Sequence, residues 1–189
     1  MTYQGETTLN IALIHHPVVN KRAEIIGSAV TNLDIHDIAR TARTYGVAEY
    51  FIATPYEDQQ NLVKELLAHW ETGHGSTYNP ARKEALSIVR LVASLEAAIA
   101  LLAEKYGKRP MLITTSALLR ETTIGYKEVT ERINSREPIL LLFGTAHGLA
   151  PEIIALSDTT LPPIKGGTNY NHLSVRSATS VILDRLLGS

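Results

Sequence analysis

Apolar residues in this chain fall into short continuous runs that alternate with stretches of helical spacing. The runs have strand length and end in turn residues, so we expect buried strands at Leu9–His16, Ala48–Pro55, Met111–Ala117 and Pro138–Phe143, and a very short one at Thr159–Leu161. Continuously apolar strands are typical of a parallel sheet that is covered on both faces. Together with the alternation of strands and helices, this pattern predicts an α/β fold with helices on both faces of a parallel sheet.

Segments with apolar residues at helical spacing connect these strands. We expect helices at Ile35–Tyr45, Asp58–Trp70, Gly125–Ile133 and Leu173–Leu187, and a short one after the glycine loop that follows Phe143. A long helix, opened by Pro80 and ending near Gly107, is expected from Ile88, Leu91, Val92, Leu95, Ala98, Ile99 and Leu102. Residues 17–31 and 71–80 are expected to be loops. Thr31, Asn32 and Asp34 all suit the N-cap of the first helix.

Length and composition narrow the class of protein. The 189 residues suit one domain over residues 1–189, with residues 1–8 as a polar arm. The chain has no cysteine, which excludes disulfides, thiolate zinc sites and a cysteine nucleophile. Its formal net charge of −1 is unlike that of a dedicated nucleic-acid binder, so RNA binding would need a local basic patch or a dimer groove. We find no apolar stretch of the ~20 residues that a membrane span needs and no signal-peptide pattern, and therefore expect a soluble cytoplasmic protein without a membrane partner.

Small and polar residues gather where three of the expected strands end. These ends are Thr114–Ser116, Gly144–Thr145 and the loop after Leu161. In an open α/β sheet, ligands bind outside the carboxyl ends of the strands. Glycine allows the backbone to approach a ligand closely, which suits a nucleoside recognised through main-chain groups. Glycine placement alone is equally consistent with simple strand termination.

Other chemical signatures are absent from the sequence. It contains no P-loop, no strand-linked dinucleotide fingerprint, no zinc-protease H-E-x-x-H and no nucleophile elbow. The seven histidines form no metal motif, and we expect no metal. His15 and His16 are adjacent on a strand and point to opposite faces, so we interpret them as ordinary hydrogen-bonded residues.

Three segments carry a family resemblance. The ending LLLFGTAHGLAPEI … LPPIKGGTNYNHLSVRSATSVIL resembles the two C-terminal motifs of the SPOUT class of S-adenosylmethionine-dependent RNA methyltransferases, which joins the SpoU-like and TrmD-like enzymes. The segment NLDIHDIARTARTYGV resembles their first motif. The resemblance spans about Leu9 to Leu187 and is nearest to a bacterial family that also occurs fused behind a TrmD-like enzyme.

The resemblance implies a deep C-terminal trefoil knot that binds S-adenosylmethionine. Its walls are then expected at Thr114, Thr115, Ser116, Phe143, Gly144, Thr145, Leu161, Ile164, Gly166, Tyr170, Asn171, Leu173 and Ser174. By analogy, main-chain groups near Leu161, Ile164 and Leu173 hold the adenine. Gly144 lets the backbone approach the cofactor, and Tyr170 and Asn171 close the loop over it. The resemblance also implies a homodimer with the first and last helices at its interface.

The resemblance also suggests candidate catalytic residues. Arg40 matches the arginine of the first motif, which lies near the RNA phosphate or the target hydroxyl. Asp34, six residues before it, stands where SpoU-like enzymes carry asparagine, and it could act as a base or cap the helix. Asn32 could take the role instead, although its spacing does not match. Candidates for RNA contact are Lys21, Arg22, Arg40, Arg43, Arg82, Lys83 and Lys165.

Three hypotheses about function follow. The first is an S-adenosylmethionine-dependent methyltransferase that acts as a homodimer on tRNA or rRNA. The second is a non-catalytic RNA-binding or ribosome-assembly module that keeps the knotted fold. The third, a small-molecule α/β binding protein, would explain the pocket but not the arginine-bearing first helix.

Overall fold

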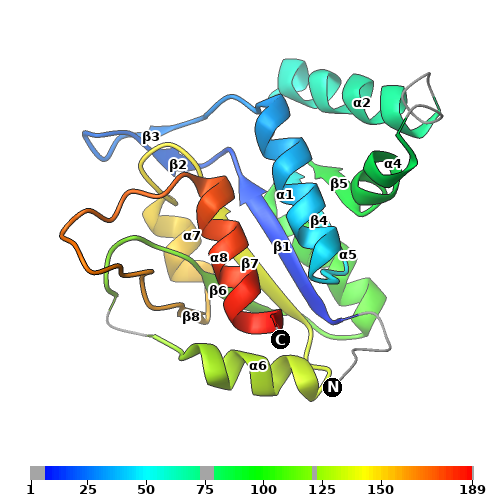
Figure 1. Ribbon diagram of the computed structural model, residues 1–189. Coiled ribbons are helices and arrows are strands. Elements are labelled where there is room, and N and C mark those ends of the chain that lie inside the picture. The colour runs from blue at the N-terminus through cyan, green and yellow to red at the C-terminus, as the bar shows by residue number, and fades with distance from the viewer. Residues whose placement is uncertain (1–6, 73–78, 121–122, 189) are drawn as a thin grey trace.

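The computed structural model describes residues 7–72, 79–120 and 123–188. Within these ranges six strands form one parallel sheet in the order β5-β4-β1-β7-β6-β8 (Figure 1). The strands are β1 (Leu9–Ile14), β4 (Tyr50–Ala53), β5 (Val89–Val92), β6 (Met111–Thr114), β7 (Ile139–Gly144) and β8 (Thr159–Thr160). The predicted α/β class with a parallel sheet is therefore confirmed. Most of the predicted arm and of the predicted 71–80 loop lies outside the described residues.

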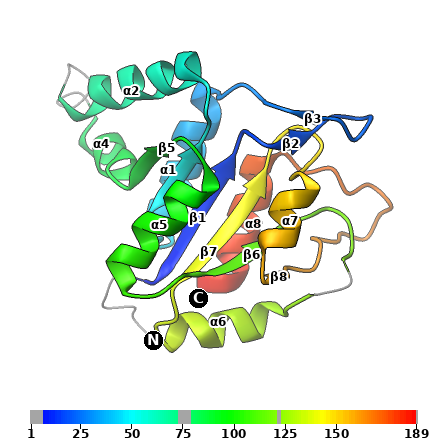
Figure 2. The same cartoon turned by 180° about the vertical axis from the view of Figure 1, so that it is seen from behind.

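Helices cover both faces of the sheet. On one face lie α1 (Asn32–Thr44), α6 (Tyr126–Asn134) and α8 (Val175–Leu187), and on the other lie α5 (Leu95–Tyr106) and α7 (Pro151–Leu156) (Figures 1 and 2). Two further helices, α2 (Glu57–Glu71) and α4 (Pro80–Leu86), pack at the β5 edge beside α1.

The alternation of side chains along β1 explains the two layers. Leu9, Ile11 and Leu13 belong to the core beneath α1 and α8. Ala12 and Ile14 belong to the core beneath α5 and α7. Successive side chains of a strand point to opposite faces, so a strand that is buried on both faces must be apolar throughout.

The prediction of one long helix between Pro80 and Gly107 is wrong. The helix α4 ends at Leu86, residues Val89–Val92 form β5 beside β4, and α5 begins after Ser94. Pairing with the edge of the sheet outweighed the helical spacing of the apolar residues, and the β-branched Val89 and Val92 suit a strand. The predicted end is confirmed, because Gly107 follows α5 in the left-handed conformation with φ 70°.

Ser94 is the residue that separates β5 from α5. Its side chain accepts a hydrogen bond from the main-chain N–H of Ala97 (3.3 Å) and caps the helix. We expect Ser94→Ala to lower the free energy of unfolding by about 1 kcal/mol in chemical denaturation. As a control, Ser135→Ala removes an exposed hydroxyl that bonds the Glu131 carbonyl at a helix end, with an expected change below about 0.5 kcal/mol. Equal losses in the two variants would contradict the capping role.

A short hairpin replaces part of the loop expected at residues 17–31. β2 (Val18–Val19) and β3 (Ile25–Ile26) pair antiparallel, and Val18 also bridges to Leu149 in the loop after β7. The hairpin therefore rests against the carboxyl edge of the sheet, and the segment that follows it leads into α1.

Candidate active site

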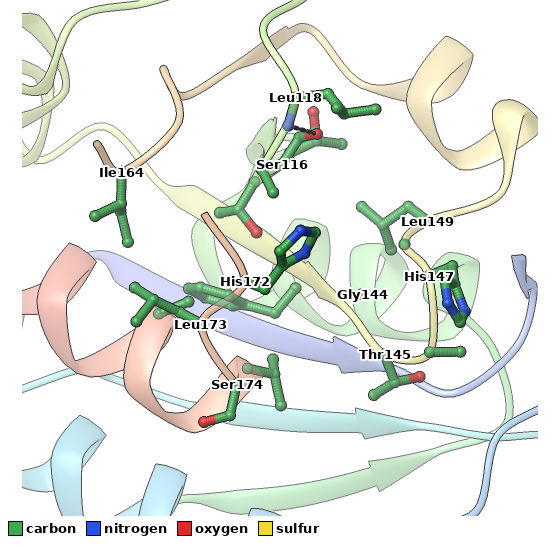
Figure 3. Close-up of a pocket in the computed structure, with 18 of the residues that line it drawn as sticks. Ser116, Leu118, Gly144, Thr145, His147, Leu149, Ile164, His172, Leu173 and Ser174 are labelled. Atoms are coloured by element: carbon green, nitrogen blue, oxygen red, sulfur yellow. Dashed lines mark hydrogen bonds between the residues drawn. The ribbon is translucent and has the colours of Figure 1, made fainter. Parts of the chain in front are cut away.

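A pocket of about 830 Å³ opens at the carboxyl ends of β6, β7 and β8. Its size lies within the range of small-molecule sites. Of the residues predicted to hold a cofactor, Thr114, Thr115, Ser116, Phe143, Gly144, Thr145, Leu161, Ile164, Asn171, Leu173 and Ser174 line it. Figure 3 shows Ile164 and Leu173 on one side of the pocket and Thr145 and Leu149 on the other.

Two residues predicted for this wall, Gly166 and Tyr170, do not line the pocket. They lie in the exposed part of the C-terminal loop, where the Tyr170 side chain is 74% exposed. The Tyr170 ring packs edge-on against the ring of His172, with centroids 5.3 Å apart. In this conformation the Tyr170 side chain is directed to solvent and does not close over the pocket.

Main-chain bonds hold the C-terminal segment between β6 and the loop that follows it. Leu161 N donates to Thr114 O (2.9 Å), and Ile124 N donates to Thr160 O (3.0 Å). Farther along, the Asn171 side-chain amide donates to Ala117 O (2.9 Å). The segment then returns across the sheet face to α8, which places Leu173 and Ser174 against the pocket.

Gly144 is required by the close approach of the loop that follows β7. A Cβ at this position would lie 2.8 Å from the main-chain N of Leu149 and 3.0 Å from the carbonyl carbon of Gly148. Both atoms belong to a loop that folds back through Gly148 at φ 119°. Gly144 is thus required by a contact within the chain itself, and its approach to the cofactor stays a prediction.

Apart from Asp34, sequence reasoning did not identify a second wall of the pocket, which comes from the N-terminal part of the chain. Val19, Ser28, Ala29 and Asp34 form this wall, and Arg120, His147 and His172 are also among the lining residues. The signal that could have found this wall is strand order. Since Ile14 pairs with Gly144 in parallel strands, the segments that follow them must meet.

The N-terminal wall carries a polar network. The Ser28 hydroxyl lies 3.1 Å from Nδ1 of His15 and is hydrogen-bonded to the Thr145 hydroxyl. Thr145 Oγ1 also donates to the main-chain O of Ile14 (3.0 Å). Two predicted loops are thus joined by side chains beneath the pocket.

Asp34 lines the pocket, but it does not cap the first helix. The N-cap is Thr31, whose Oγ1 accepts from Asp34 N (3.2 Å) and donates to Asp34 Oδ2 (2.6 Å). The other carboxylate oxygen pairs with Arg176 of α8 at 3.0 Å. The predictions of Asn32 and Asp34 as N-caps are wrong, because both lie inside the first helical turn.

Arg40 and Asn32 lie outside the pocket lining. Both are exposed on α1, and Arg40 follows Asp34 by six residues, or about 9 Å along the helix axis. Within one chain, Arg40 is therefore placed to meet a ligand on the surface of α1 rather than one enclosed with Asp34.

Burial favours the neutral forms of two side chains behind the pocket, His15 and Tyr50. Desolvation lowers the pKa of His15, while the Asp34 carboxylate and main-chain groups of Ser28 and Ala29 partly oppose this shift. Burial, and then the Asp34 charge, raise the pKa of Tyr50 well above its ordinary value.

Among the described residues, no three His, Asp or Glu side chains gather as a metal site. No helix in the described part of the chain is long and apolar enough to span a membrane.

This geometry defines the class of protein. It is an α/β protein with a nucleoside-sized pocket at the carboxyl edge of a parallel sheet. The profile of the family described as SAM-dependent RNA methyltransferase matches residues 8–188. The chain belongs to this family.

The chain is also similar to individual proteins and solved structures. A protein named tRNA (guanine-N(1)-)-methyltransferase of Oleidesulfovibrio alaskensis is 48% identical over 95% of this chain, which spans only 42% of that relative. An uncharacterised protein of Aquifex aeolicus is 38% identical over 93% of this chain and 86% of its own length. The fold is similar to that of the SpoU methyltransferase AviRb of Streptomyces viridochromogenes, solved with the cofactor AdoMet, at TM-score 0.60 and 16% identity over 94% of this chain and 56% of that one.

Proposed function

We propose that this chain transfers a methyl group from S-adenosylmethionine to a nucleotide of tRNA or rRNA. The observation that carries the proposal is the pocket between the ends of β6 and β7 and the C-terminal segment, in a chain of this methyltransferase family. This chain spans about two fifths of the length of the tRNA methyltransferase relatives. Their whole activity is therefore not assigned to it. We also propose a cytoplasmic location, which an RNA substrate supports.

The pocket suits a nucleoside cofactor held by main-chain groups. Bound there, S-adenosylmethionine supplies an already activated methyl group, so the protein has to align the acceptor and take up its proton. The residues proposed to hold the cofactor form the C-terminal wall of the pocket. This wall consists of the lining residues at and after the ends of β6, β7 and β8, among them Thr114, Gly144, Leu161 and Ser174. Gly144 supports this fit because its missing side chain leaves the loop after β7 close to the strand.

We also propose that the C-terminal segment forms a trefoil knot and that the protein is a homodimer through α1 and α8. Thr160 pairs with β6 on one side, and its carbonyl accepts a hydrogen bond from Ile124 N on the other. Contacts on both sides support a threaded segment. The two helices pack side by side on one face of the sheet, and Leu33 on α1 is 58% exposed. A single exposed leucine is common on protein surfaces, so the interface is proposed from the family resemblance and from the packing of α1 beside α8.

Calorimetric titration with S-adenosylmethionine tests the cofactor site. One molecule is expected to bind per chain. A folded dimer that releases no heat and shows no thermal stabilisation at millimolar cofactor would remove the proposed cofactor role.

Arg40 is proposed to contact the RNA backbone. We expect Arg40→Ala to weaken RNA binding about 3–10-fold and to reduce its salt dependence, as measured by filter binding of total tRNA, with unchanged affinity for S-adenosylmethionine. Arg43→Ala is the matched control, because Arg43 on the same helix is already paired with Glu84 at 2.8 Å. Equal losses in the two variants would contradict a specific role for Arg40.

A non-catalytic RNA-binding module is the second candidate. Asp34, the carboxylate that lines the pocket, is already engaged by Thr31 and Arg176, which reduces its capacity to act as a base. Under this alternative the pocket binds the cofactor and no methyl group reaches RNA.

A further inference from the structure

A buried histidine lies directly behind the N-terminal wall of the pocket. His15 is 0% exposed, and its Nδ1 lies 3.1 Å from the hydroxyl of Ser28, which lines the pocket. Its Nε2 is buried and has no hydrogen-bond partner within the part of the chain that the structure describes. A buried polar atom without a partner is costly, so this arrangement calls for an explanation.

We propose that Ser28 contacts the acceptor group of the methyl transfer and passes its proton to His15. Ser28 is then a catalytic residue, and His15 is a positioning residue that acts through it. This inference rests on the proposed function, and it supplies the proton acceptor that the already engaged Asp34 carboxylate does not provide.

The two walls of the pocket suit such a division of tasks. The residues assigned to the cofactor come from the loops after β6, β7 and β8, whereas Ser28 and Asp34 come from the opposite, N-terminal side. A cofactor held on the first wall leaves the second wall to face the acceptor. Ser28 is the hydroxyl-bearing residue of that second wall within the described chain.

The hydrogen bonds around Ser28 allow its proton to point at His15. The Thr145 hydroxyl has two acceptors within reach, the Ser28 hydroxyl oxygen and the main-chain O of Ile14. The Ser28 hydroxyl likewise has two acceptors within reach, Nδ1 of His15 (3.1 Å) and the main-chain O of His15 (3.4 Å). The relay uses the arrangement in which Thr145 donates to Ser28 rather than to Ile14, and Ser28 donates to Nδ1 of His15, which then carries its own proton on Nε2. The remaining lone pair of the Ser28 oxygen accepts the proton of the acceptor group.

The transfer balances in atoms and charge. The bond between the acceptor atom and its hydrogen breaks as the bond to the methyl group forms, and the electron pair of the methyl–sulfur bond stays on sulfur. The acceptor proton moves to Ser28 Oγ, and the former Ser28 proton moves to Nδ1 of His15. One positive charge thus leaves sulfur and appears on the imidazole.

The groups that face His15 suit a base that is neutral at rest. Burial lowers the pKa of His15, which keeps the ring unprotonated near neutral pH. Asp34 from α1 and main-chain groups of Ser28 and Ala29 favour the protonated form once it arises, and Thr145 bonds Ser28. Arg176 from α8 is paired with Asp34 and moderates its charge.

The test is the pH dependence of single-turnover methyl transfer, with protein preloaded with S-adenosylmethionine and total RNA from a strain that lacks the gene. The wild-type rate is expected to rise with pH through an inflection below the ordinary histidine pKa and then to level off. His15→Gln and Ser28→Ala are expected to lose the inflection and about 100-fold of the plateau rate. Their calorimetric affinity for S-adenosylmethionine is expected to remain within about 3-fold of wild type.

His16→Gln is the matched control, because His16 packs edge-on against Tyr56 outside the pocket lining, and it is expected to keep the wild-type profile. If His15→Gln transferred methyl groups at the wild-type rate with the same inflection, or if Ser28→Ala kept full activity, the inference would be overturned and the proposed function would stand. Absence of transfer by the wild-type protein would instead contradict the proposed function, and the inference with it.

A second measurement needs no RNA. In protein labelled with ¹⁵N-histidine, the nitrogen shifts of His15 at neutral pH are expected to report a neutral ring with its proton on Nε2. A neutral ring with its proton on Nδ1 would point the Ser28–His15 hydrogen bond the wrong way and would overturn the proposed relay.

Discussion

Gly144→Ala is expected to weaken S-adenosylmethionine binding about 10–100-fold and to lower the free energy of unfolding by about 1–3 kcal/mol. The added Cβ would lie 2.8 Å from the main-chain N of Leu149, so either β7 or the loop after it must move. That loop lines the pocket, and a 10–100-fold loss of affinity corresponds to about 1.4–2.8 kcal/mol of binding free energy, comparable to about two hydrogen bonds. The affinity for S-adenosylmethionine is measured by calorimetry at a temperature where the variant is folded.

Gly166→Ala is the matched control for this glycine. A Cβ at Gly166 meets nothing within 4 Å, and its backbone does not require positive φ. Binding and stability are expected to stay at the wild-type values. Unchanged affinity in Gly144→Ala, or an equal loss in Gly166→Ala, would contradict the assignment of the loop after β7 to the cofactor site.

Leu183→Ala is expected to lower the free energy of unfolding by about 2–5 kcal/mol. Leu183 is 0% exposed and lies in the core beneath α8, so its removal leaves a cavity where the C-terminal segment is anchored to the sheet. Urea denaturation measures the loss, and S-adenosylmethionine at 100 times its dissociation constant is expected to restore about 2.7 kcal/mol.

Leu101→Ala is the control for this core substitution. Leu101 on α5 is 47% exposed, and a change within about 0.5 kcal/mol is expected. A loss in Leu183→Ala as small as that expected for Leu101→Ala would mean that α8 contributes little to the stability of the segment that bounds the pocket.

The C-terminal wall of the pocket was within reach of sequence reasoning. Thr114, Gly144 and Leu161 stand at strand ends, and parallel strands bring such ends to one edge of the sheet. The N-terminal wall was not, because Ser28 belongs to a segment without a motif. Its position follows from the pairing of β1 with β7, which joins residues 130 positions apart. The hydrogen bond of Thr145 with the main-chain O of Ile14 belongs to the same junction.

The edge strand β5 was missed for a different physical reason. Leu91, Val92, Leu95 and Ala98 follow helical spacing, and a single sequence cannot show that β4 offers an unpaired edge beside them. Asp34 illustrates a similar limit. Its position suited a cap or a base, but its ion pair with Arg176 depends on the packing of α8 against α1.

The proposed methyltransferase activity is tested by methyl transfer to RNA. Wild-type protein is incubated with methyl-labelled S-adenosylmethionine and total RNA from a strain that lacks the gene, and the labelled nucleotide is mapped. We predict incorporation at a defined nucleotide of tRNA or rRNA that Gly144→Ala reduces and Gly166→Ala preserves. Protein that binds the cofactor and RNA but leaves every RNA unlabelled would contradict the account and identify a non-catalytic RNA-binding module.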